Sequence, residues 1–528
     1  MHPRLYAQSH PNKPALIMAE TGEQRSYGEL EALGNRGAQF LRKCGIKNGD
    51  IIALWARNSL EFLEVYWAAQ RAGVYICPLP VYLSVDDAAY ILGNCGAKLL
   101  VVSSEIKAAE AFVKSAHEDL PARQHMYYLH EAVGETASWA EEIAAMPDTP
   151  ISDEESGFHL IYSSGTTGRP KGVKLPLIGG PVIADTKWST RYEKIYNLTD
   201  KSVFLACAPL YHSAPLLFST NTMRRGATIV ITKKFTPEST LKAIQDYGVT
   251  MSQMVPTMFI RMLRLPEDER QSYDVSSLEY VIHAAAPCPR EVKLQMMDWL
   301  GDIIEEYYAG SEANGLTTIT SEEWRKRPGS VGKALNSTVH ICDDTGQELP
   351  SGTIGNVYFE GGYDFQYLGE PEKTKKSRNP LHPKWSTLGD IGYVDDEDYL
   401  FLTDRKNFVI ISGGVNIYPQ ETENLIIQHP KVFDVAIIGV PNEDMGEEMK
   451  AVIHPVDWAD ANDTFGQEII DFCREKLGPI KAPKSVDFDK ALPRQENGKL
   501  YKRAYYAHVI GLKRKHKKAS RKRGSLYK

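Results

Sequence analysis

The chain has 528 residues, of which 42% are hydrophobic and 24% are charged, with a formal net charge of −7 at pH 7. This length and composition predict a globular protein with two or three domains and more than one hydrophobic core. The first residues are polar, and no uninterrupted apolar run approaches the roughly 18 residues needed to cross a bilayer. These features argue against a secreted or integral membrane protein.

The seven cysteines are scattered through the chain without a Cys-x-x-Cys pair. Their odd number argues against a complete disulfide framework, so reduced thiols and a cytoplasmic location are expected. Residues 513–528 contain nine Lys and Arg and no acidic residue, which leaves a net −16 on the rest of the chain. Residues 511–528 are therefore predicted to form a disordered basic tail.

The tail lacks interleaved aromatic residues and an amphipathic period, so a solvated terminus is favoured over an RNA-binding segment, and no nucleic-acid partner is expected. Peripheral contact with an anionic membrane remains a possible role for the tail. The oligomeric state is not fixed by the sequence.

Helix-like and strand-like stretches alternate through the first 309 residues. Apolar residues recur at helical spacing at 27–41 and 60–72, and Thr236-Pro237 predicts the start of another helix. Strands are predicted at 51–56, 74–80, 99–102, 228–232, 249–255, 278–286 and 303–309. This alternation predicts an α/β architecture of layered, mostly parallel sheets.

After residue 353 the pattern changes to short strands separated by Gly, Asp and Asn turns, which predicts an antiparallel β subdomain. These strands are expected at 354–360, 391–394, 399–403 and 408–412. Farther on, a helix at Pro419, strands at 432–440 and 449–454 and a helix at 467–477 predict a small α+β unit. We therefore predict a large N-terminal domain at 1–404 and a smaller, mobile C-terminal domain at 405–510.

Residues 162–173, Tyr-Ser-Ser-Gly-Thr-Thr-Gly-Arg-Pro-Lys-Gly-Val, have the composition of a phosphate-binding loop at the exit of an apolar strand, 158–162. Backbone amides at glycines and adjacent hydroxyls would bind the anion, and Lys171 would supply charge. The candidates are Ser163, Ser164, Gly165, Thr166, Thr167, Gly168 and Lys171. A glycine-rich surface loop with a chance lysine is an equal alternative for such a match alone. Because Lys171 lies between Pro170 and Gly172, the string is not a Walker A loop.

The whole string resembles the signature of the adenylate-forming superfamily, which includes acyl-CoA synthetases, luciferases and peptide-synthetase adenylation domains. A second stretch, Tyr-Tyr-Ala-Gly-Ser-Glu-Ala-Asn at 307–314, offers a hydroxyl for a phosphate oxygen and a carboxylate for a hard cation. A Ser-Glu pair alone is more often a helix cap. Similarity to the family motif Tyr-Gly-x-Thr-Glu implies instead that Ala309 and Ser311 contact ATP. It also implies that Glu312, with Ser164, holds Mg²⁺.

Ser-Thr-Leu-Gly-Asp at 386–390 resembles the family's Thr-Gly-Asp motif, which implies that Asp390 binds the ribose hydroxyls of ATP. Arg405 matches the arginine at the family's domain junction, again near the ribose. Taken alone, Asp390 reads as a turn residue and Arg405 as a surface ion pair.

The resemblance continues into the C-terminal part of the chain. Asn407 stands at the family's hinge position, where aspartate or lysine is usual, and asparagine tolerates the backbone rotation that a hinge needs. Ser-Gly-Gly-Val-Asn-Ile-Tyr-Pro-Gln-Glu at 412–421 matches the glycine loop that implies CoA contacts at Gly413 and Gly414. Lys499 matches the lysine that enters the active site for adenylation, although Asn-Gly-Lys alone reads as a hairpin turn.

The acid-binding residues are less clearly marked. Pro-Leu-Tyr-His-Ser-Ala-Pro at 209–215 resembles the family segment beside the incoming carboxylate, which makes Tyr211 and His212 candidates, with a buried core histidine as an equal alternative. His-Ala-Ala-Ala-Pro at 283–287 occupies the place of the usual Ser-Gly-Gly-Ala-Pro, so His283 and Ala285 are expected near the acyl pocket, which the alanines would narrow.

The resemblance implies an AMP-forming acyl-CoA ligase that uses ATP, Mg²⁺ and coenzyme A and acts on a small-molecule carboxylic acid. No dedicated cation for a second polar end is visible, which favours a medium- or long-chain fatty acid, with aromatic, alicyclic and steroid side-chain acids close behind. A stand-alone adenylation enzyme, a luciferase-like monooxygenase and a non-catalytic nucleotide sensor are the remaining alternatives.

Overall fold

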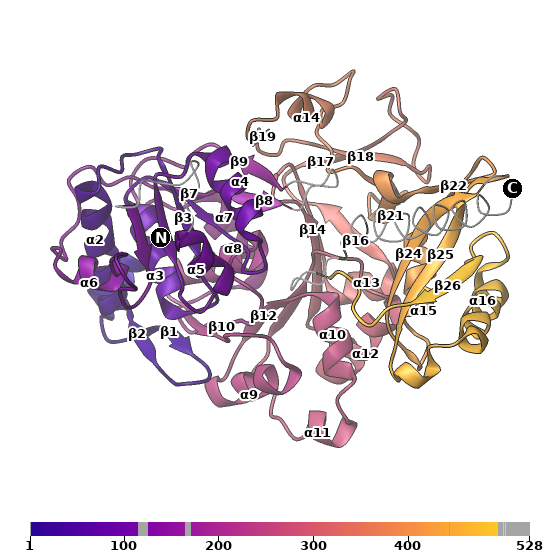
Figure 1. The fold of residues 1–528 in the computed structure, drawn as a ribbon, viewed down its shortest axis with the longest axis horizontal. Coiled ribbons are helices and arrows are strands. Elements are labelled where there is room, and N and C mark those ends of the chain that lie inside the picture. Colours follow the sequence, from indigo (N-terminus) through magenta and orange to yellow (C-terminus); the bar gives the residue numbers. More distant parts are fainter. Residues whose placement is uncertain are drawn as a thin grey trace, which may run out of the picture. The chain divides into compact units, whose positions relative to one another are not determined.

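The computed structural model describes residues 2–114, 125–163, 170–442, 444–494, 500 and 502 (Figure 1). The chain divides into two compact units. The first comprises Met1–Ala284, Met296–Asn314 and Gly362–Lys376, and the second comprises Ala285–Gln295, Gly315–Gly361 and Ser377–Lys528.

The first unit contains a mostly parallel sheet in the order β14-β13-β12-β10-β11-β1-β2. The described pairings are parallel except the one between β1 and β2, which is antiparallel. The strands are β1 (Pro14–Met18), β2 (Gln24–Ser26), β10 (Val203–Ala206), β11 (Thr228–Ile231), β12 (Met251–Met254), β13 (Tyr280–His283) and β14 (Ile304–Ala309). The carboxyl ends of the six parallel strands, all but β2, therefore meet at one edge, where α/β sheets bind ligands.

A second sheet of the same unit is parallel throughout, in the order β6-β5-β3-β4-β7. Its strands are β3 (Ile51–Trp55), β4 (Tyr75–Pro78), β5 (Leu99–Val102), β6 (Met126–Tyr128) and β7 (Phe158–His159). All five residues of β3 are buried, as the unbroken apolar run Ile-Ile-Ala-Leu-Trp predicts for a strand covered on both faces. A third, three-stranded sheet has the order β19-β9-β8 and consists of β8 (Ile161–Ser163), β9 (Lys171–Lys174) and β19 (Gln366–Tyr367).

Local sequence signals explain where the helices begin and end. Ser26 and Glu29 form a reciprocal capping box at the start of α2, and Thr236 with Pro237 starts α9 as predicted. Gly96 ends α4 in the left-handed conformation at φ 65°. The helices that belong wholly to the first unit are α1 (Pro3–Ser9), α2 (Tyr27–Lys43), α3 (Leu60–Arg71), α4 (Val85–Cys95), α5 (Lys107–Lys114), α6 (Trp139–Ala144), α7 (Lys187–Tyr196), α8 (Ser213–Met223), α9 (Pro237–Tyr247), α10 (Pro256–Leu263), α11 (Glu267–Gln271) and α14 (Pro371–Lys376). The range of α12 (Arg290–Leu300) spans both units.

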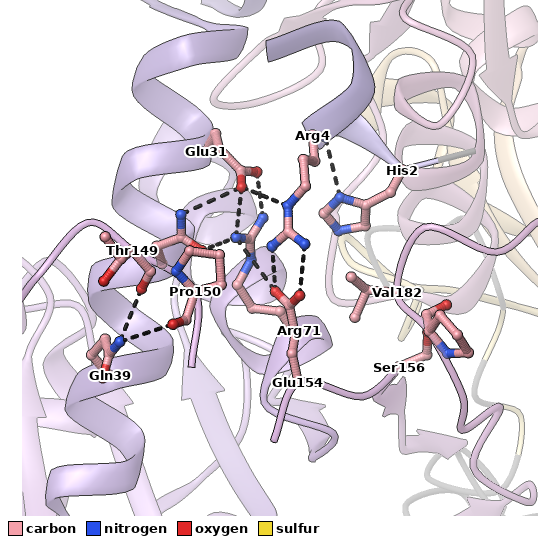
Figure 2. A network of polar contacts seen from close by, with 12 residues as sticks. His2, Arg4, Glu31, Gln39, Arg71, Thr149, Pro150, Glu154, Ser156 and Val182 are labelled. Carbon is pink, nitrogen blue, oxygen red and sulfur yellow. Dashed lines mark hydrogen bonds and ion pairs between the residues drawn. The ribbon is translucent and has the colours of Figure 1, made fainter. Parts of the chain in front are cut away.

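A buried network of charged side chains ties α1 to α2 and α3 (Figure 2). Arg71, whose side chain is 1% exposed, lies 2.5 Å from Glu31, which also accepts a hydrogen bond from Arg4 Nε at 2.8 Å. Arg4 reaches Glu154 through Nη1 at 2.7 Å. Because removing one partner would leave a buried charge unpaired, this network fixes α1 against α2 and α3.

The second unit is built on an antiparallel sheet in the order β15-β16-β21-β20-β18-β17. The elements here are β15 (Leu316–Ile319), α13 (Ser321–Lys326), β16 (Ser330–Ala334), β17 (Thr338–Cys342), β18 (Gly355–Glu360), β20 (Asp390–Val394) and β21 (Leu400–Arg405). This arrangement confirms the antiparallel part of the expected fold.

The C-terminal residues of the second unit form a smaller α+β arrangement around the long hairpin of β24 and β25. Its sheet has the order β23-β22-β25-β24, with β26 parallel to β25. The elements are η2 (Lys406–Phe408), β22 (Ile410–Ser412), β23 (Val415–Ile417), α15 (Pro419–Ile426), β24 (Val432–Asn442), β25 (Gly446–Pro455), η3 (Trp458–Asp460), α16 (Asp463–Leu477) and β26 (Ser485–Phe488).

The structure confirms the predicted α/β class, with large parallel sheets, antiparallel strands and a smaller α+β part. The strand expected at 408–412 is shorter, because the 3-10 turn η2 ends at Phe408 and the strand begins only at Ile410. The two compact units follow from packing density and are not the predicted domains, and Asp404 lies within the second unit. The predicted domain boundary near Asp404 therefore stays a prediction. Residues 511–528 lie outside the described residues.

Two further expectations concern membranes and thiols. Within the described part of the chain, no helix combines the length and hydropathy that crossing a bilayer requires. All seven cysteines are free thiols, as their scattered positions predict.

Candidate active site

The predicted phosphate loop connects two antiparallel strands of the first unit. β8 (Ile161–Ser163) pairs with β9 (Lys171–Lys174), and Ser163 lies opposite Lys171. The loop residues Ser164, Gly165, Thr166, Thr167 and Gly168 lie outside the described residues. The apolar run 158–162 was expected to form one strand, but it divides into β7 and β8. The loop therefore follows a hairpin strand and not a strand of the parallel sheet.

Gly172, the third glycine of the string, has a packing role. It lies in β9, where an added Cβ would come within 2.8 Å of the Tyr162 ring. Burial raises the pKa of Tyr162, whose hydroxyl donates a hydrogen bond to Asn94 at 2.5 Å. Glycine at 172 therefore meets a steric requirement in the strand next to the loop.

Lys171 and Glu312, which are far apart in the sequence, both contact one tyrosine. Lys171 Nζ lies 4.5 Å from the ring centroid of Tyr367, and the Tyr367 hydroxyl donates a hydrogen bond to Glu312 Oε1 at 2.8 Å. Tyr367 belongs to β19 (Gln366–Tyr367), which pairs antiparallel with β9. The structure thus brings together the two candidate catalytic residues of the first unit through a residue that the sequence analysis did not identify.

Glu312 lies in a tight turn and not at a helix start. The strand β14 ends at Ala309, and the amide of Ala313 donates to the carbonyl of Gly310 at 3.0 Å. The alternative that Ser311 and Glu312 cap a helix is therefore wrong, because the next element is the strand β15. Glu312 is 9% exposed, so a cation at its carboxylate would be partly shielded from water.

The segment that carries Tyr367 packs closely on this turn. The amide of Tyr363 donates to the carbonyl of Ala313 at 3.0 Å, and a Cβ on Gly362 would lie 1.9 Å from the carbonyl oxygen of Asn314. Glycine is required at 362 because the two backbones approach each other so closely. This close approach fixes the distance between Glu312 and the strand β19.

Three acyl-site candidates follow parallel strands at the carboxyl edge of the larger sheet. Tyr211 and His212 lie between β10 and α8, and His283 is the last residue of β13. Tyr211 is 3% exposed and its ring makes an edge contact with Tyr82 at 6.4 Å. His212 is half-buried next to Tyr211, with ring centroids 4.7 Å apart.

His283 has the surroundings of a core histidine. It is fully buried, its Nε2 lies 3.4 Å from Oε2 of Glu306, and its ring packs edge-on against Phe259 at 5.4 Å. Glu306 pairs in register with His283 across β13 and β14. If His283 contacts the substrate acid, it would do so while its ring also faces the carboxylate of Glu306.

In the second unit, Asp390 and Arg405 lie opposite each other on neighbouring strands. They pair in register at the ends of β20 and β21, and Arg405 Nε donates to Asp390 Oδ1 at 3.1 Å. The Asp390 side chain is 8% exposed and that of Arg405 is 32% exposed. Gly389, at φ 85°, turns the chain just before Asp390. The structure therefore brings together the two predicted ribose residues.

The residue before Arg405 connects this hairpin to the next helix. Asp404 Oδ2 accepts a hydrogen bond from the amide of Gln420, in the first turn of α15, at 3.0 Å. Burial raises the pKa of Asp404, and this amide bond opposes the rise. Asn407 follows in η2 and is not among the residues with positive φ.

The glycine loop is a tight hairpin turn between β22 and β23. Gly413 and Gly414 have φ of 56° and 80°, and the amide of Gly413 donates to the carbonyl of Met445 at 2.8 Å. Both conformations favour glycine. Ala285, in contrast, holds a φ of 75° with a methyl group and is exposed.

Lys499 lies outside the described residues. Arg494 and Leu500, the described residues on either side of 495–499, form an isolated antiparallel bridge. Arg494 is anchored by Asp434 at 2.6 Å.

Comparison with known proteins places this site in a family. The AMP-binding enzyme family matches residues 4–365, and the AMP-binding enzyme C-terminal domain matches residues 421–499. The long-chain-fatty-acid–CoA ligase FadD13 of Mycobacterium tuberculosis is 29% identical over 511 residues, which covers 94% of this chain and 96% of that protein. The feruloyl-CoA synthase of an Amycolatopsis species is 30% identical over 492 residues, covering 92% and 94% respectively.

A solved structure gives the same result for the fold. The crystal structure of ATP-bound MatB from Rhodopseudomonas palustris has a TM-score of 0.79 at 26% identity and covers 96% of this chain and 98% of that chain.

Proposed function

The chain belongs to the AMP-binding enzyme family, as an acyl-CoA synthetase of the adenylate-forming superfamily, and we propose that it activates a medium- or long-chain fatty acid. In the first step, a carboxylate oxygen of the acid attacks the α-phosphorus of ATP. The bond from this phosphorus to the oxygen shared with the β-phosphate breaks, which gives acyl-AMP and pyrophosphate. In the second step, the sulfur of CoA attacks the acyl carbon, and AMP leaves as the thioester forms.

Charge neutralisation is the main task of the protein in the first step. We assign this role to Lys171, to Lys499 and to the amides and hydroxyls of the loop. Ser163, Ala309 and Ser311 would add contacts to ATP, and Asp390 with Arg405 would hold its ribose. The observation that carries this assignment is the contact of Lys171 and Glu312 with the same tyrosine.

Magnesium fits the donor set around Glu312. Among the described residues, no cluster of three or more His, Cys, Asp or Glu could hold a metal ion by itself. Mg²⁺ is commonly held by one or two carboxylates together with phosphate oxygens and water, so a single glutamate suits an ion that arrives with ATP. Mg²⁺ would neutralise phosphate charge; Glu312, with the hydroxyl of Ser164, would hold it.

The second step needs a different arrangement of the C-terminal residues, because one lysine cannot serve both steps. We propose that residues 405–510 rotate about the segment at Asn407, which exchanges Lys499 for the Gly413–Gly414 turn. The compact turn would let the pantetheine arm of CoA pass close to the backbone.

The choice of a fatty acid rests on the character of the acyl candidates. Tyr211 is buried against another tyrosine, Ala285 is apolar, and His283 already faces the carboxylate of Glu306 at 3.4 Å. None of these offers a permanent cation for a second polar end of the substrate, so an apolar tail is favoured. The likeness to FadD13 over 94% of the chain supports the same choice.

The proposal is tested by AMP release with a panel of fatty acids of increasing length. Acid-dependent exchange between ATP and pyrophosphate should occur before CoA is added. Lys499→Ala should abolish this exchange while leaving thioester formation from supplied acyl-AMP largely intact. Full exchange by the variant would remove Lys499 from the first step.

An aromatic acid is the second candidate, favoured by the 30% identity to feruloyl-CoA synthase and by the edge contact of Tyr82 with Tyr211. An aromatic ring would find a partner in such a pair. Faster AMP release with a hydroxycinnamic acid than with any fatty acid would establish it. Formation of acyl-AMP with no conversion to a thioester when CoA is present would instead indicate a stand-alone adenylation enzyme.

A further inference from the structure

Tyr367 is held rigidly between Lys171 and Glu312 by its backbone. Its amide donates to Thr374 Oγ1 at 3.0 Å, and the next amide, of Leu368, donates to the carbonyl of Gly172 at 2.8 Å. Tyr367 is 7% exposed, so few side-chain rotamers are open to it. The side chain therefore has a defined direction between the strand that begins with Lys171 and the turn that carries Glu312.

We propose that Tyr367 is a positioning residue for the ATP-dependent step, which orients the Glu312 carboxylate toward magnesium while its ring supports the Lys171 cation. This inference rests on the proposed function, because it assigns Glu312 to the metal and Lys171 to the phosphates. Tyr367 itself would touch neither ATP nor the acid.

The two contacts of Tyr367 reinforce each other. A cation over the face of a phenol ring draws electron density from it, which makes the hydroxyl a better hydrogen-bond donor. The carboxylate that accepts this bond returns density to the ring and improves it as a platform for the lysine. We therefore expect the charges of Lys171 and Glu312 to be coupled through the ring, which contacts Lys171 Nζ at 4.5 Å and Glu312 at 2.8 Å.

The hydroxyl also determines which oxygen of Glu312 is available. It occupies Oε1, and among the described residues no hydrogen bond or ion pair of Oε2 is found. Oε2 therefore remains as the oxygen for a hard cation, and the bond at Oε1 fixes its direction. Partners that hold a metal ligand in this way commonly change metal affinity by about 10-fold or more when they are removed.

A purely structural role is the competing explanation. Tyr367 is part of a hydrophobic core, and its ring makes an edge contact with Phe365 at 5.3 Å. A core residue would affect stability and would not affect magnesium specifically. The experiment must therefore separate folding from metal binding.

The variant Tyr367→Phe removes only the hydroxyl and keeps the ring under Lys171. Tyr75→Phe is a matched control, because Tyr75 is also buried and also contacts a lysine of β9. Lys174 Nζ lies 5.2 Å from the centroid of the Tyr75 ring. The Tyr75 hydroxyl donates to the carbonyl of Leu175 at 2.8 Å and not to a carboxylate. Both variants lose one buried phenol hydrogen bond near β9.

The readout is calorimetric binding of a non-hydrolysable ATP analogue over a range of Mg²⁺ concentrations, with thermal unfolding measured in parallel. We expect Tyr367→Phe to raise the Mg²⁺ concentration for half-maximal binding about 10-fold. Tyr75→Phe should leave that concentration unchanged. An unchanged magnesium requirement in Tyr367→Phe would overturn the proposal, as would an equal rise in the control.

A double-mutant cycle with Glu312→Gln tests whether Tyr367 acts through the glutamate. If it does, Tyr367→Phe should produce no additional magnesium effect once Glu312 is replaced. A full 10-fold effect in both backgrounds would overturn the proposal. Because binding is measured without an acid, these results stand apart from the acid panel, whose failure would refute the proposed function instead.

Discussion

Asp390 offers a direct test of the assignment of the ribose site, through the substitution Asp390→Asn. The side chain is 8% exposed and sits at the start of β20, opposite Arg405. Asparagine keeps the size and one acceptor oxygen of the side chain but removes its charge. Nucleotide binding should weaken if the carboxylate receives the ribose hydroxyls, while the fold should change little.

The size of the effect follows from the two hydrogen bonds at stake. A hydrogen bond to a charged acceptor contributes about 1.5–3 kcal/mol and one to a neutral acceptor about 0.5–1.5 kcal/mol. The loss is therefore about 1 kcal/mol per hydroxyl, or about 2 kcal/mol in total, which corresponds to a roughly 30-fold higher Kd for ATP. The lost pair with Arg405 should lower the free energy of unfolding by less than about 1 kcal/mol, because the arginine is 32% exposed.

The decisive assay compares ATP with 2′-deoxy-ATP and 3′-deoxy-ATP in both proteins. Removing one ribose hydroxyl should weaken nucleotide binding about 30-fold in the natural chain and about 5-fold in Asp390→Asn. The factor is smaller in the variant because a hydrogen bond to a neutral acceptor contributes less free energy than one to a carboxylate. Asp395→Asn is the control, since Asp395 lies in the turn of the same hairpin and pairs with Arg327 at 3.5 Å. If the substitution Asp390→Asn raised the Kd by the same factor for ATP and for both deoxynucleotides, the reasoning would be refuted.

Three other predictions concern stability and the CoA step. Burial raises the pKa of Glu64 from 4.5 to about 7 in spite of Arg25, so the folded chain keeps a proton that the unfolded chain releases, and stability falls as pH rises through this window. In urea unfolding, Glu64→Gln should have nearly the same free energy of unfolding as the natural chain at about pH 5, and a free energy higher by up to about 3 kcal/mol at about pH 8. A lower free energy of unfolding at the higher pH would mean that the ion pair between Glu64 and Arg25 dominates. Gly413→Ala places a methyl group at φ 56° and should raise KM for CoA while pyrophosphate exchange stays unchanged, and equal loss of both half-reactions would contradict its place in the second step. Arg71→Met should lower the free energy of unfolding by about 3 kcal/mol because Glu31 loses a buried partner, and a change below about 1 kcal/mol would show that the network is readily replaced.

Much of the fold could be predicted from the sequence because its signals are local. The run at 99–102 became β5 without change, and Thr236-Pro237 started a helix where a capping threonine precedes a proline. In these cases the physical cause lies within a few residues of its effect.

The parts that the sequence did not reveal depend on pairing between distant segments. Tyr367 reaches Lys171 and Glu312 only because β19 adds to the edge of β9, and two residues of strand carry no periodic signal. Similarly, Glu306 faces His283 because β13 and β14 align in one register among several that the pattern allows. The division of 158–162 into β7 and β8 has the same origin, since each half pairs with a different sheet.

The departures of the chain from its family pattern differ in physical weight. Ala285 stands where glycine is usual and still holds φ at 75°, so the surrounding structure imposes the glycine-like backbone on a residue that resists it by about 1 kcal/mol. Asn407 shows the opposite case, because its φ is not positive in this structure and the tolerance of asparagine is not used. If the proposed acyl site and hinge are correct, selectivity for the acid should follow the side chains at 283–285, whereas Asn407 should influence rates only when the backbone at 407 moves.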